Sequence, residues 1–357
     1  MALKRIIVFA AGIALALFVV SLFGLHETIA ALLRTRLDVF LVCVALQLAS
    51  VALIVLRIKI LARSRGYLSY SYATRLTLSG VFVSMITPFA KLGGEPLKMY
   101  MLGKNIGKYN ASAAIAVESL VELLSSFVVM LVVTLVFFSS IPADFISLFI
   151  AVLAVLSVGI ALFAKLISSP HWLHGIGRWA IKKLERFYSF GDKDHMSMFS
   201  NSMAVMWKRK SVVYGAFSVS VLSKIIEIAR FWFVFLALGV ALPFTTAVVV
   251  WTILLVIVFI PWLPGSLGLV EFSGISALIV MGVPQSAAAS IMILDRFLSL
   301  WLTLLIGMAA LSWAKRRNEL PRISMPKKGG KSDPSTNQPS GSVQANLFCQ
   351  RKNKRFF

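Results

Sequence analysis

Long apolar runs recur along this sequence and constrain its fold more than any other feature. A helix of about 20 apolar residues crosses the roughly 30 Å hydrocarbon core of a bilayer. Six runs have about that length or more, 59% of all residues are hydrophobic and only 14% are charged, which excludes an ordinary water-soluble protein. The sequence predicts an all-α polytopic membrane protein with full spans near residues 6–25, 39–56, 112–138, 145–167, 212–240 and 287–313.

The distribution of Lys and Arg predicts the orientation of these spans. The chain has 36 Lys and Arg against 14 Asp and Glu, and segments 57–75 and 165–210 are especially basic. Because Lys and Arg accumulate in cytoplasmic loops, we expect a multi-pass protein of the cell membrane with both termini in the cytoplasm. Arg34 and Arg36 then lie outside, against this rule. The basic excess lies between spans and not on a soluble fold, so no nucleic-acid partner is expected.

Two further apolar stretches, 76–108 and 246–282, do not read as single crossings. Proline and glycine interrupt them at 87–96 and 261–271. Such breaks free backbone groups that hydrocarbon cannot satisfy, so the broken chain must be buried in protein or line a wet cavity. We therefore expect two re-entrant helical hairpins beside the six spans, one entering from the cytoplasm and one from outside.

The two halves of the chain share an order of landmarks. Glu95 follows Pro88 by seven positions, and Glu271 follows Pro264 by seven positions. In each half a glycine, a small-residue stretch and then a membrane acid follow at nearly equal spacings. These are Gly107 and Glu118 in the first half, and Gly282 and Asp295 in the second.

This pattern predicts an inverted-topology repeat, the architecture of many secondary transporters, in which broken helices meet near the midplane. Repeat one covers about 1–140 and repeat two about 145–314. Residues 315–357 are basic and rich in Ser, Pro and Gly, and are expected to form a disordered cytoplasmic tail.

Ionisable residues inside the apolar segments are costly, so each needs a partner or a role. One interpretation is a set of structural ion pairs; Lys224, Glu227 and Arg230, spaced three apart, fit local neutralisation best. The other is a polar cavity for a zwitterionic or anionic headgroup. The candidate binding residues are Lys91, Gly93, Gly94, Glu95, Lys98, Glu118, Glu122, Lys224, Glu227, Arg230, Gly265, Gly268, Glu271, Asp295 and Arg296.

Specific roles can be assigned within this set. Pro96 at the first helical position and Gly268 before its half-helix would direct two helix N-termini at a phosphate, although Glu95 and Glu271 could instead be dipole partners. We expect Lys91, Lys98, Arg230 and Arg296 near the phosphate. Glu118 and Glu122, like charges one turn apart, need a cation or a shared proton.

No cofactor or metal is expected. Cys43 and Cys349 are far apart in the sequence, and neither has a nearby Cys or His. His171 and His174 have the spacing of a helical metal pair but lie in a basic, amphipathic stretch, 171–190, that reads as an interfacial helix.

These motifs resemble the flippase-like transmembrane domain family, the membrane region of lysylphosphatidylglycerol synthase (multiple peptide resistance factor). The resemblance rests on residues 86–98, the Ala-rich segment ending in Glu118, residues 261–271, Gly282 and the Asp295-Arg296 pair, and it covers roughly 5–315. One departure is Ser119, where many relatives carry Arg after the glutamate.

The resemblance implies lipid translocation. In full-length relatives this region moves aminoacylated phosphatidylglycerol between leaflets while a separate soluble domain makes the lipid, and some archaeal relatives are associated with polyprenyl-phosphate sugars. No segment here resembles that soluble domain, so lysyltransferase activity is not expected of the chain alone. The expected partners are membrane lipids, phospholipid or polyprenyl-linked, and a separate lipid-modifying enzyme. Two alternatives are a subunit or enzyme of lipid aminoacyl or glycosyl transfer and a small-solute transporter.

Overall fold

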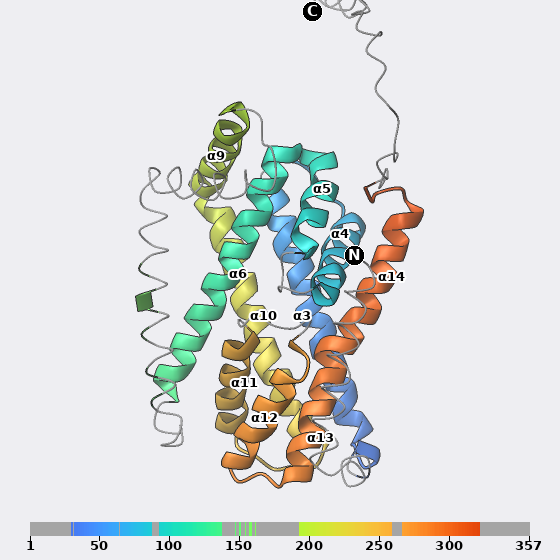
Figure 1. Cartoon of the computed structure of the whole chain (residues 1–357), viewed down its shortest axis with the longest axis vertical. Coiled ribbons are helices and arrows are strands. Elements are labelled where there is room, and N and C mark those ends of the chain that lie inside the picture. Colours follow the sequence, from blue (N-terminus) through green and yellow to red (C-terminus); the bar gives the residue numbers. More distant parts are fainter. Residues whose placement is uncertain are drawn as a thin grey trace, which may run out of the picture. The chain divides into compact units, whose positions relative to one another are not determined.

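Four long helical segments form the frame of the protein (Figure 1). Three are single helices, and the fourth is a continuous segment of two α-helices joined by a π-helical stretch. They are α3 (Leu37–Arg63), α6 (Lys108–Val136), α10 (Lys210–Ala237), and α13 (Gln285–Arg296) followed by η4 (Phe297–Leu302) and α14 (Thr303–Arg316).

The structure, a computed structural model, describes most of the chain between residues 32 and 321. All regular secondary structure in its described residues is helical, which confirms the predicted class of a helical membrane protein. The predicted first span, most of the span at 145–167, the stretch 171–190 and most of the tail lie outside these residues. The described ranges are 32–63, 65–87, 93–137, 193–258 and 266–321, with a few single positions besides.

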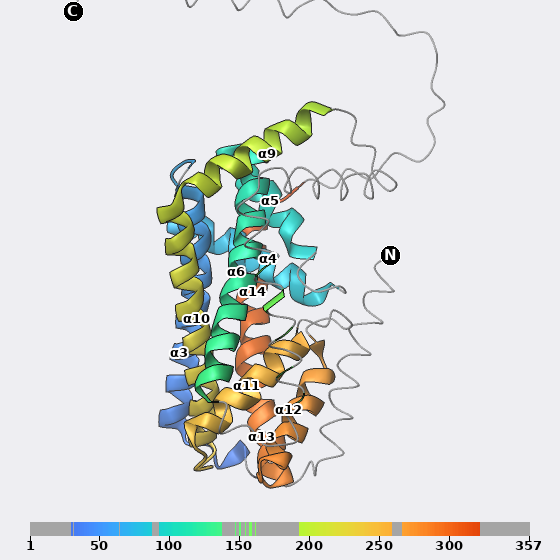
Figure 2. The ribbon, with the colours of Figure 1, turned by 90° about the vertical axis from the view of Figure 1, so that its left-hand side faces the viewer.

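Three of the long segments are apolar enough to cross a membrane: α3, α6 and the segment Gln285–Arg316. They correspond to the predicted spans at 39–56, 112–138 and 287–313. Helix α10, with 28 residues, has the length as well, but Lys224, Glu227 and Arg230 lie in its middle. Figure 2 shows α3, α6 and α10 running along the same axis.

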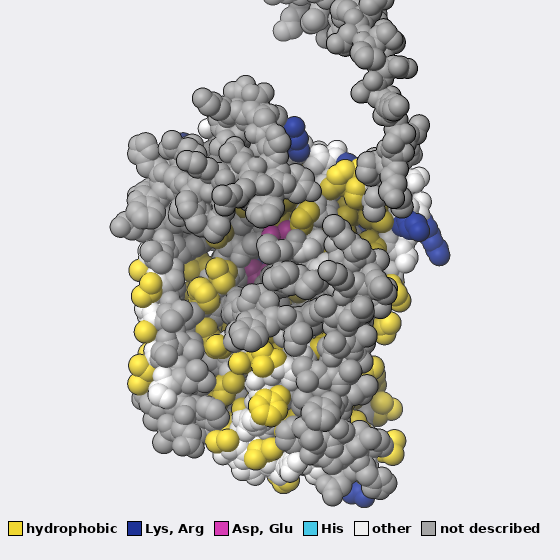
Figure 3. Space-filling view, viewed as in Figure 1, with side chains coloured by type: hydrophobic (Ala, Val, Ile, Leu, Met, Phe, Trp, Pro, Cys, Tyr) yellow, Lys and Arg dark blue, Asp and Glu magenta, His cyan; other side chains and the backbone are white. Residues whose placement is uncertain are grey.

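Apolar side chains face outward and charged ones face inward. Leu41 of α3 is 59% exposed and Leu305 of α14 is 56% exposed, whereas Arg57, Glu118 and Arg230 are at most 4% exposed. Water-soluble proteins show the opposite arrangement, because their charges remain in water. On the face in Figure 3 no Lys or Arg atoms of the described residues are visible at mid-length, where most of the coloured side-chain atoms are apolar.

Two pairs of shorter helices pack against this frame. Helix α4 (Tyr70–Ile86) packs against α5 (Gly94–Ile106), and α11 (Phe244–Val258) packs against α12 (Leu269–Val280). The first pair lies toward the end where α9 (Lys193–Lys208) lies, and the second toward the opposite end (Figures 1 and 2). These pairs occupy the two predicted broken stretches, and residues 88–92 and 259–265 between their helices are outside the described chain.

Glycine permits close helix packing and sharp turns at specific positions. A Cβ on Gly94 would overlap the carbonyl oxygen of Gly80, so α4 and α5 approach backbone to backbone at that point. Gly107 precedes α6 and Gly282 precedes α13, both with φ of +84°. The two landmark glycines of the sequence thus make the same kind of turn at equivalent places.

Two apolar clusters divide the core. One is formed mainly by α3, α4, α5 and α6, and the other mainly by α10, α11, α12 and α13. A third, small cluster joins Leu267, Leu300 and Leu304 to Phe82 and Met85. Helix α3 packs along α10, and α14 packs along α4, so the two halves contact each other through long helices.

Two arginines predicted to lie in the basic cytoplasmic segment belong to helices instead. Arg57 is inside α3, which continues to Arg63, and is only 4% exposed. Arg75 is inside α4, where its guanidinium binds Glu319 at 2.7 and 2.9 Å and lies 4.6 Å from the ring centre of Trp313. The prediction was wrong because partners distant in sequence compensate both charges.

Candidate functional site: a charged cavity between the helix pairs

A cavity of about 370 Å³ lies between the two halves of the protein. Its lining comes from α3, α4, α5, α6, α10, α11, α13, η4 and α14, with Ser266 just before α12. Ligand pockets for small molecules start at about this size. Among the described residues nine charged side chains line it: Arg57, Glu95, Lys98, Glu118, Glu122, Lys224, Glu227, Arg230 and Arg296.

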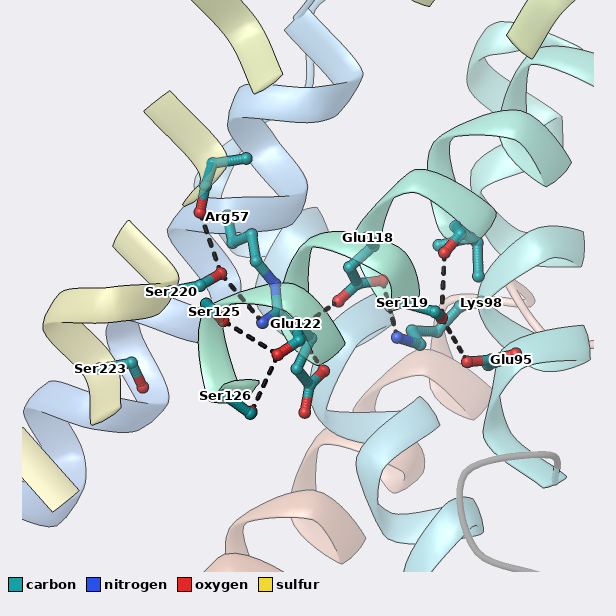
Figure 4. Close-up of polar contacts among 12 residues, drawn as sticks. Arg57, Glu95, Lys98, Glu118, Ser119, Glu122, Ser125, Ser126, Ser220 and Ser223 are labelled. Carbon is teal, nitrogen blue, oxygen red and sulfur yellow. Dashed lines mark hydrogen bonds and ion pairs between the residues drawn. The ribbon is translucent and has the colours of Figure 1, made fainter. Parts of the chain in front are cut away.

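Arg57 is the centre of the first group of charges (Figure 4). Its Nη2 lies 3.0 Å from Glu118 and 2.8 Å from Glu122, and its Nη1 donates to Ser220 of α10 at 3.3 Å. Glu118 also accepts from Lys98 at 2.8 Å. Arg57 of α3 therefore supplies the cation that Glu118 and Glu122 require, and Lys98 of α5 supplies a second one.

A second group of ion pairs joins α10, α12 and α13. Arg230 lies 2.8 Å from Asp295, and Arg296 lies 3.2 Å from Glu271. The other oxygen of Glu271 accepts the backbone N–H of Gly268 at 2.6 Å, so this carboxylate caps its own helix as well as binding Arg296. Asp295 and Glu271 do not line the cavity themselves, but each binds an arginine that does.

The three charges in the middle of α10 are not a purely local set. Lys224 binds Glu227 at 3.1 Å, as the spacing predicts, but Arg230 binds Asp295 on another helix. Ser50 of α3 hydrogen-bonds to Ser223 at 3.0 Å and to Glu227 at 3.4 Å. Local neutralisation therefore holds for one pair and fails for Arg230.

The first group of contacts recurs in the second half. In each half an arginine on the helix before the broken stretch binds the acid on the helix after it: Arg57 with Glu118, and Arg230 with Asp295. The glutamate after the break binds the residue that follows this acid. In the first half that residue is Ser119, whose hydroxyl donates to Glu95. In the second half it is Arg296, which forms an ion pair with Glu271.

The remaining predicted residues have varied surroundings. Gly93 and Gly94 open α5, and their Cβ positions are occupied by Thr87 and by Gly80, so both glycines serve packing between α4 and α5. Pro96 is the third residue of α5, not the first, because the helix begins at Gly94. Gly268 is the N-cap of α12, as expected. Lys91 and Gly265 lie outside the described residues.

The sequence analysis missed several residues of the cavity. Arg57 was assigned to a loop, although its position one residue after an apolar run could have suggested a buried helix end. Gln47 donates to Thr303 at 3.0 Å between α3 and α14, and single polar residues of this kind give no signal in an apolar run. The π-helical stretch places Ser299 and Leu300 in the lining. Such stretches occur frequently at functional sites.

Metal ligands do not gather in the part of the chain that the structure describes. No group of three or more His, Cys, Asp or Glu suited to a metal ion occurs among the residues searched there. In the cavity every described Lys and Arg contacts a carboxylate.

Comparison with known proteins gives the family. Residues 5–307 match the family described as the lysylphosphatidylglycerol synthase TM region. The chain belongs to this family. The match covers nearly the whole frame and all residues of the cavity, which confirms the resemblance seen in the sequence motifs.

The family contains archaeal relatives of similar length. A UPF0104 membrane protein of Methanothermobacter thermautotrophicus is 28% identical over 291 residues, 76% of this chain and 84% of the relative. One of Pyrococcus horikoshii is 22% identical over 85% of this chain and 96% of its own length. One of Methanocaldococcus jannaschii is 25% identical over 84% of this chain and 92% of its own.

Proposed function

We propose that this protein moves a lipid headgroup between the two leaflets of the cell membrane through the charged cavity. The observation that carries the proposal is a cavity of about 370 Å³ that nine charged side chains of the described chain line, while apolar side chains are exposed on the outside of its long helices. Each ionised residue at depth costs a few kcal/mol, so such a set is expected at a substrate pathway. The size suits a polar headgroup whose acyl chains remain in the surrounding lipid.

The proposed membrane topology has six full spans and two re-entrant hairpins. Helices α4–α5 would enter from the cytoplasm and α11–α12 from outside, with both termini cytoplasmic. Their positions toward opposite ends of the frame support this arrangement (Figure 1). The recurring Arg–acid pairs and the equivalent glycine turns support an inverted repeat, with repeat one at about 1–140 and repeat two at about 145–314.

The test is lipid exchange in reconstituted vesicles. The purified full chain is inserted into liposomes containing an acyl-chain-labelled phospholipid, and the rate at which the label becomes accessible to a membrane-impermeant quencher is measured. We expect faster exchange than in protein-free vesicles, and slower exchange in Arg296→Gln, because that variant leaves Glu271 without its ion pair.

A matched control keeps the test specific. Arg36 pairs with Asp38 at the exposed start of α3, away from the cavity, so Arg36→Gln should exchange lipid at the wild-type rate. Wild-type vesicles that exchange no labelled lipid faster than empty ones would reject lipid translocation.

A further inference from the structure

Two helix contacts between the halves occupy equivalent places in the proposed inverted repeat. In one, α14 of the second half packs against α4, the first helix of the first pair. In the other, α6 of the first half packs against α11, the first helix of the second pair. We call the α4–α14 contact the cytoplasmic seam and the α6–α11 contact the outer seam, after the sides that the proposed topology gives them.

The cytoplasmic seam is closed by an ion pair. Arg75 of α4 binds the two oxygens of Glu319 at 2.7 and 2.9 Å, and its guanidinium lies 4.6 Å from the ring centre of Trp313 on α14. Two parallel charged hydrogen bonds are stronger and more directional than one. The side chains of the pair are 9% and 14% exposed, so water weakens it less than a surface pair.

A local turn places Glu319 against α4. Helix α14 ends at Arg316, and Asn318 has a φ of +54°, which reverses the chain. The N–H of Glu319 then donates to the carbonyl of Ala314 at 3.1 Å. Lys104 of α5 donates to the carbonyls of Asn318 and Glu319 at 3.2 and 3.0 Å. Both helices of the first pair therefore hold the end of α14, which lies beside them in Figure 1.

The outer seam is closed by aromatic rings instead. Phe137, at the end of α6, meets Phe244, at the start of α11, with ring centres 6.5 Å apart and planes at 69°. Phe244 also packs edge to face on Trp232 of α10, at 5.8 Å. Such ring pairs are favourable apolar contacts but carry no net charge. Equivalent seams are thus closed by different chemistry.

Each seam leads from the cavity toward one end of the protein. All four of its helices contribute to the lining, through Val81 of α4, Glu118 of α6, Val258 of α11 and Thr303 of α14. On the cytoplasmic seam Gly307 packs closely on α4, since a Cβ there would lie 2.8 Å from the Cβ of Phe82. This contact lies one turn beyond Thr303, and the ion pair lies at the far end of the seam.

We propose that the two seams are the two gates of the cavity, and that the Arg75–Glu319 pair is the latch that keeps the cytoplasmic gate closed. Alternating access requires a barrier on each side of the site, with one open at a time. A contact made in one state and broken in the other stabilises the first, so losing the latch shifts the population toward the state open to the cytoplasm. This inference rests on the proposed function and names the contacts that control access from each side.

The test measures access to the cavity from each side of the membrane. The native cysteines are removed by Cys43→Ala and Cys349→Ser, and Ile54→Cys places a thiol in the cavity lining on α3, outside both seams. A membrane-impermeant maleimide is applied to inside-out and to right-side-out vesicles of cells that express the full chain. The labelling rates then report the open fraction on each side.

The expected changes are opposite on the two sides. Arg75→Gln and Glu319→Gln should each raise labelling from the cytoplasmic side about tenfold, the effect of losing a charged hydrogen bond, and lower it from outside. The double variant should match the single variants, because both remove the same contact. Phe137→Ala should act in reverse and raise labelling from outside.

A matched control removes a charge at the same end without touching a seam. Lys59 of α3 lies over the ring of Tyr70 on α4, within the first half, so Lys59→Gln should leave both labelling rates unchanged. Unchanged rates in Arg75→Gln, additive effects in the double variant, or faster labelling from both sides would each overturn the latch, the last because it reports a loosened fold.

The lipid-exchange assay separates this inference from the function on which it rests. Labelling rates that do not respond to the latch variants, with lipid exchange intact, reject the latch and retain translocation. Labelling that shifts between the sides as expected, in a chain that exchanges no lipid, supports the gates and rejects lipid as the cargo.

Discussion

Replacing Arg57 by methionine tests whether the buried ion pairs determine stability. Arg57 is 4% exposed and binds two carboxylates, at 3.0 Å on Glu118 and 2.8 Å on Glu122. Methionine fills much of the volume of the arginine stem but removes the charge and all its donors. Glu118 keeps Lys98 at 2.8 Å and so retains part of its compensation.

The magnitude follows from the distances. At an effective dielectric constant of about 20, two unit charges 3 Å apart attract by about 5.5 kcal/mol. The desolvation of Arg57, which methionine no longer requires, offsets part of this attraction, and removal of one partner from a buried ion pair typically costs about 3–5 kcal/mol. Because Lys98 remains beside Glu118, we expect a loss near the lower limit, about 3 kcal/mol.

The assay is reversible denaturant unfolding of the purified protein in detergent micelles. The double variant Arg57→Met with Glu122→Gln should recover at least half of the loss, because the remaining acid, Glu118, still pairs with Lys98. Arg36→Gln, at the exposed Arg36–Asp38 pair, is the matched control and should show no measurable change. A loss below about 1 kcal/mol for Arg57→Met, or a double variant no more stable than the single one, would refute the reasoning.

Three further changes probe other parts of the structure. Arg230→Met should cost as much as Arg57→Met, again about 3 kcal/mol in the unfolding assay, because its pair with Asp295 is equally buried. Gly94→Ala should lose about 1–3 kcal/mol and slow lipid exchange, since the new Cβ meets the Gly80 carbonyl; unchanged stability would contradict the packing. Arg75→Gln should speed tryptic cleavage after α14, because Glu319 no longer holds that end on α4; equal cleavage rates would argue against the contact.

Hydropathy predicted the long helices well. The length of an apolar run is set by the thickness of the bilayer and not by the helices it packs against, so it can be read from the sequence alone. The run at 212–240 corresponds to α10 at Lys210–Ala237, and the run at 287–313 to the segment Gln285–Arg316. The error at α3, predicted to end at 56 and observed to end at Arg63, came from Arg57 and Lys59. A charge marks a helix end only when no partner in the folded chain neutralises it.

The location of the charged residues was predictable, but their pairing was not. Burial of a charge in an apolar segment is visible in the sequence, so Glu118, Glu227 and Arg230 could be selected as candidates. Arg230 binds Asp295 and not Glu227 because of the way α10 packs against α13. That packing cannot be deduced from the spacing of residues along one helix. Whether these residues bind cargo remains the prediction that the transport experiments address.

The pairing has a consequence for how such a protein could open to each side in turn. Every ion pair among the described cavity residues lies within one half: Arg57 and Lys98 with Glu118 in the first, Arg230 with Asp295 in the second. The halves are joined across the cavity by hydrogen bonds in which at least one partner is neutral: Gln47 with Thr303, Ser50 with Ser223 and Glu227, and Arg57 with Ser220. Breaking a hydrogen bond that has a neutral partner costs less than separating two buried charges. The halves could therefore move against each other while each keeps its own charges compensated, as alternating access to a central headgroup site requires.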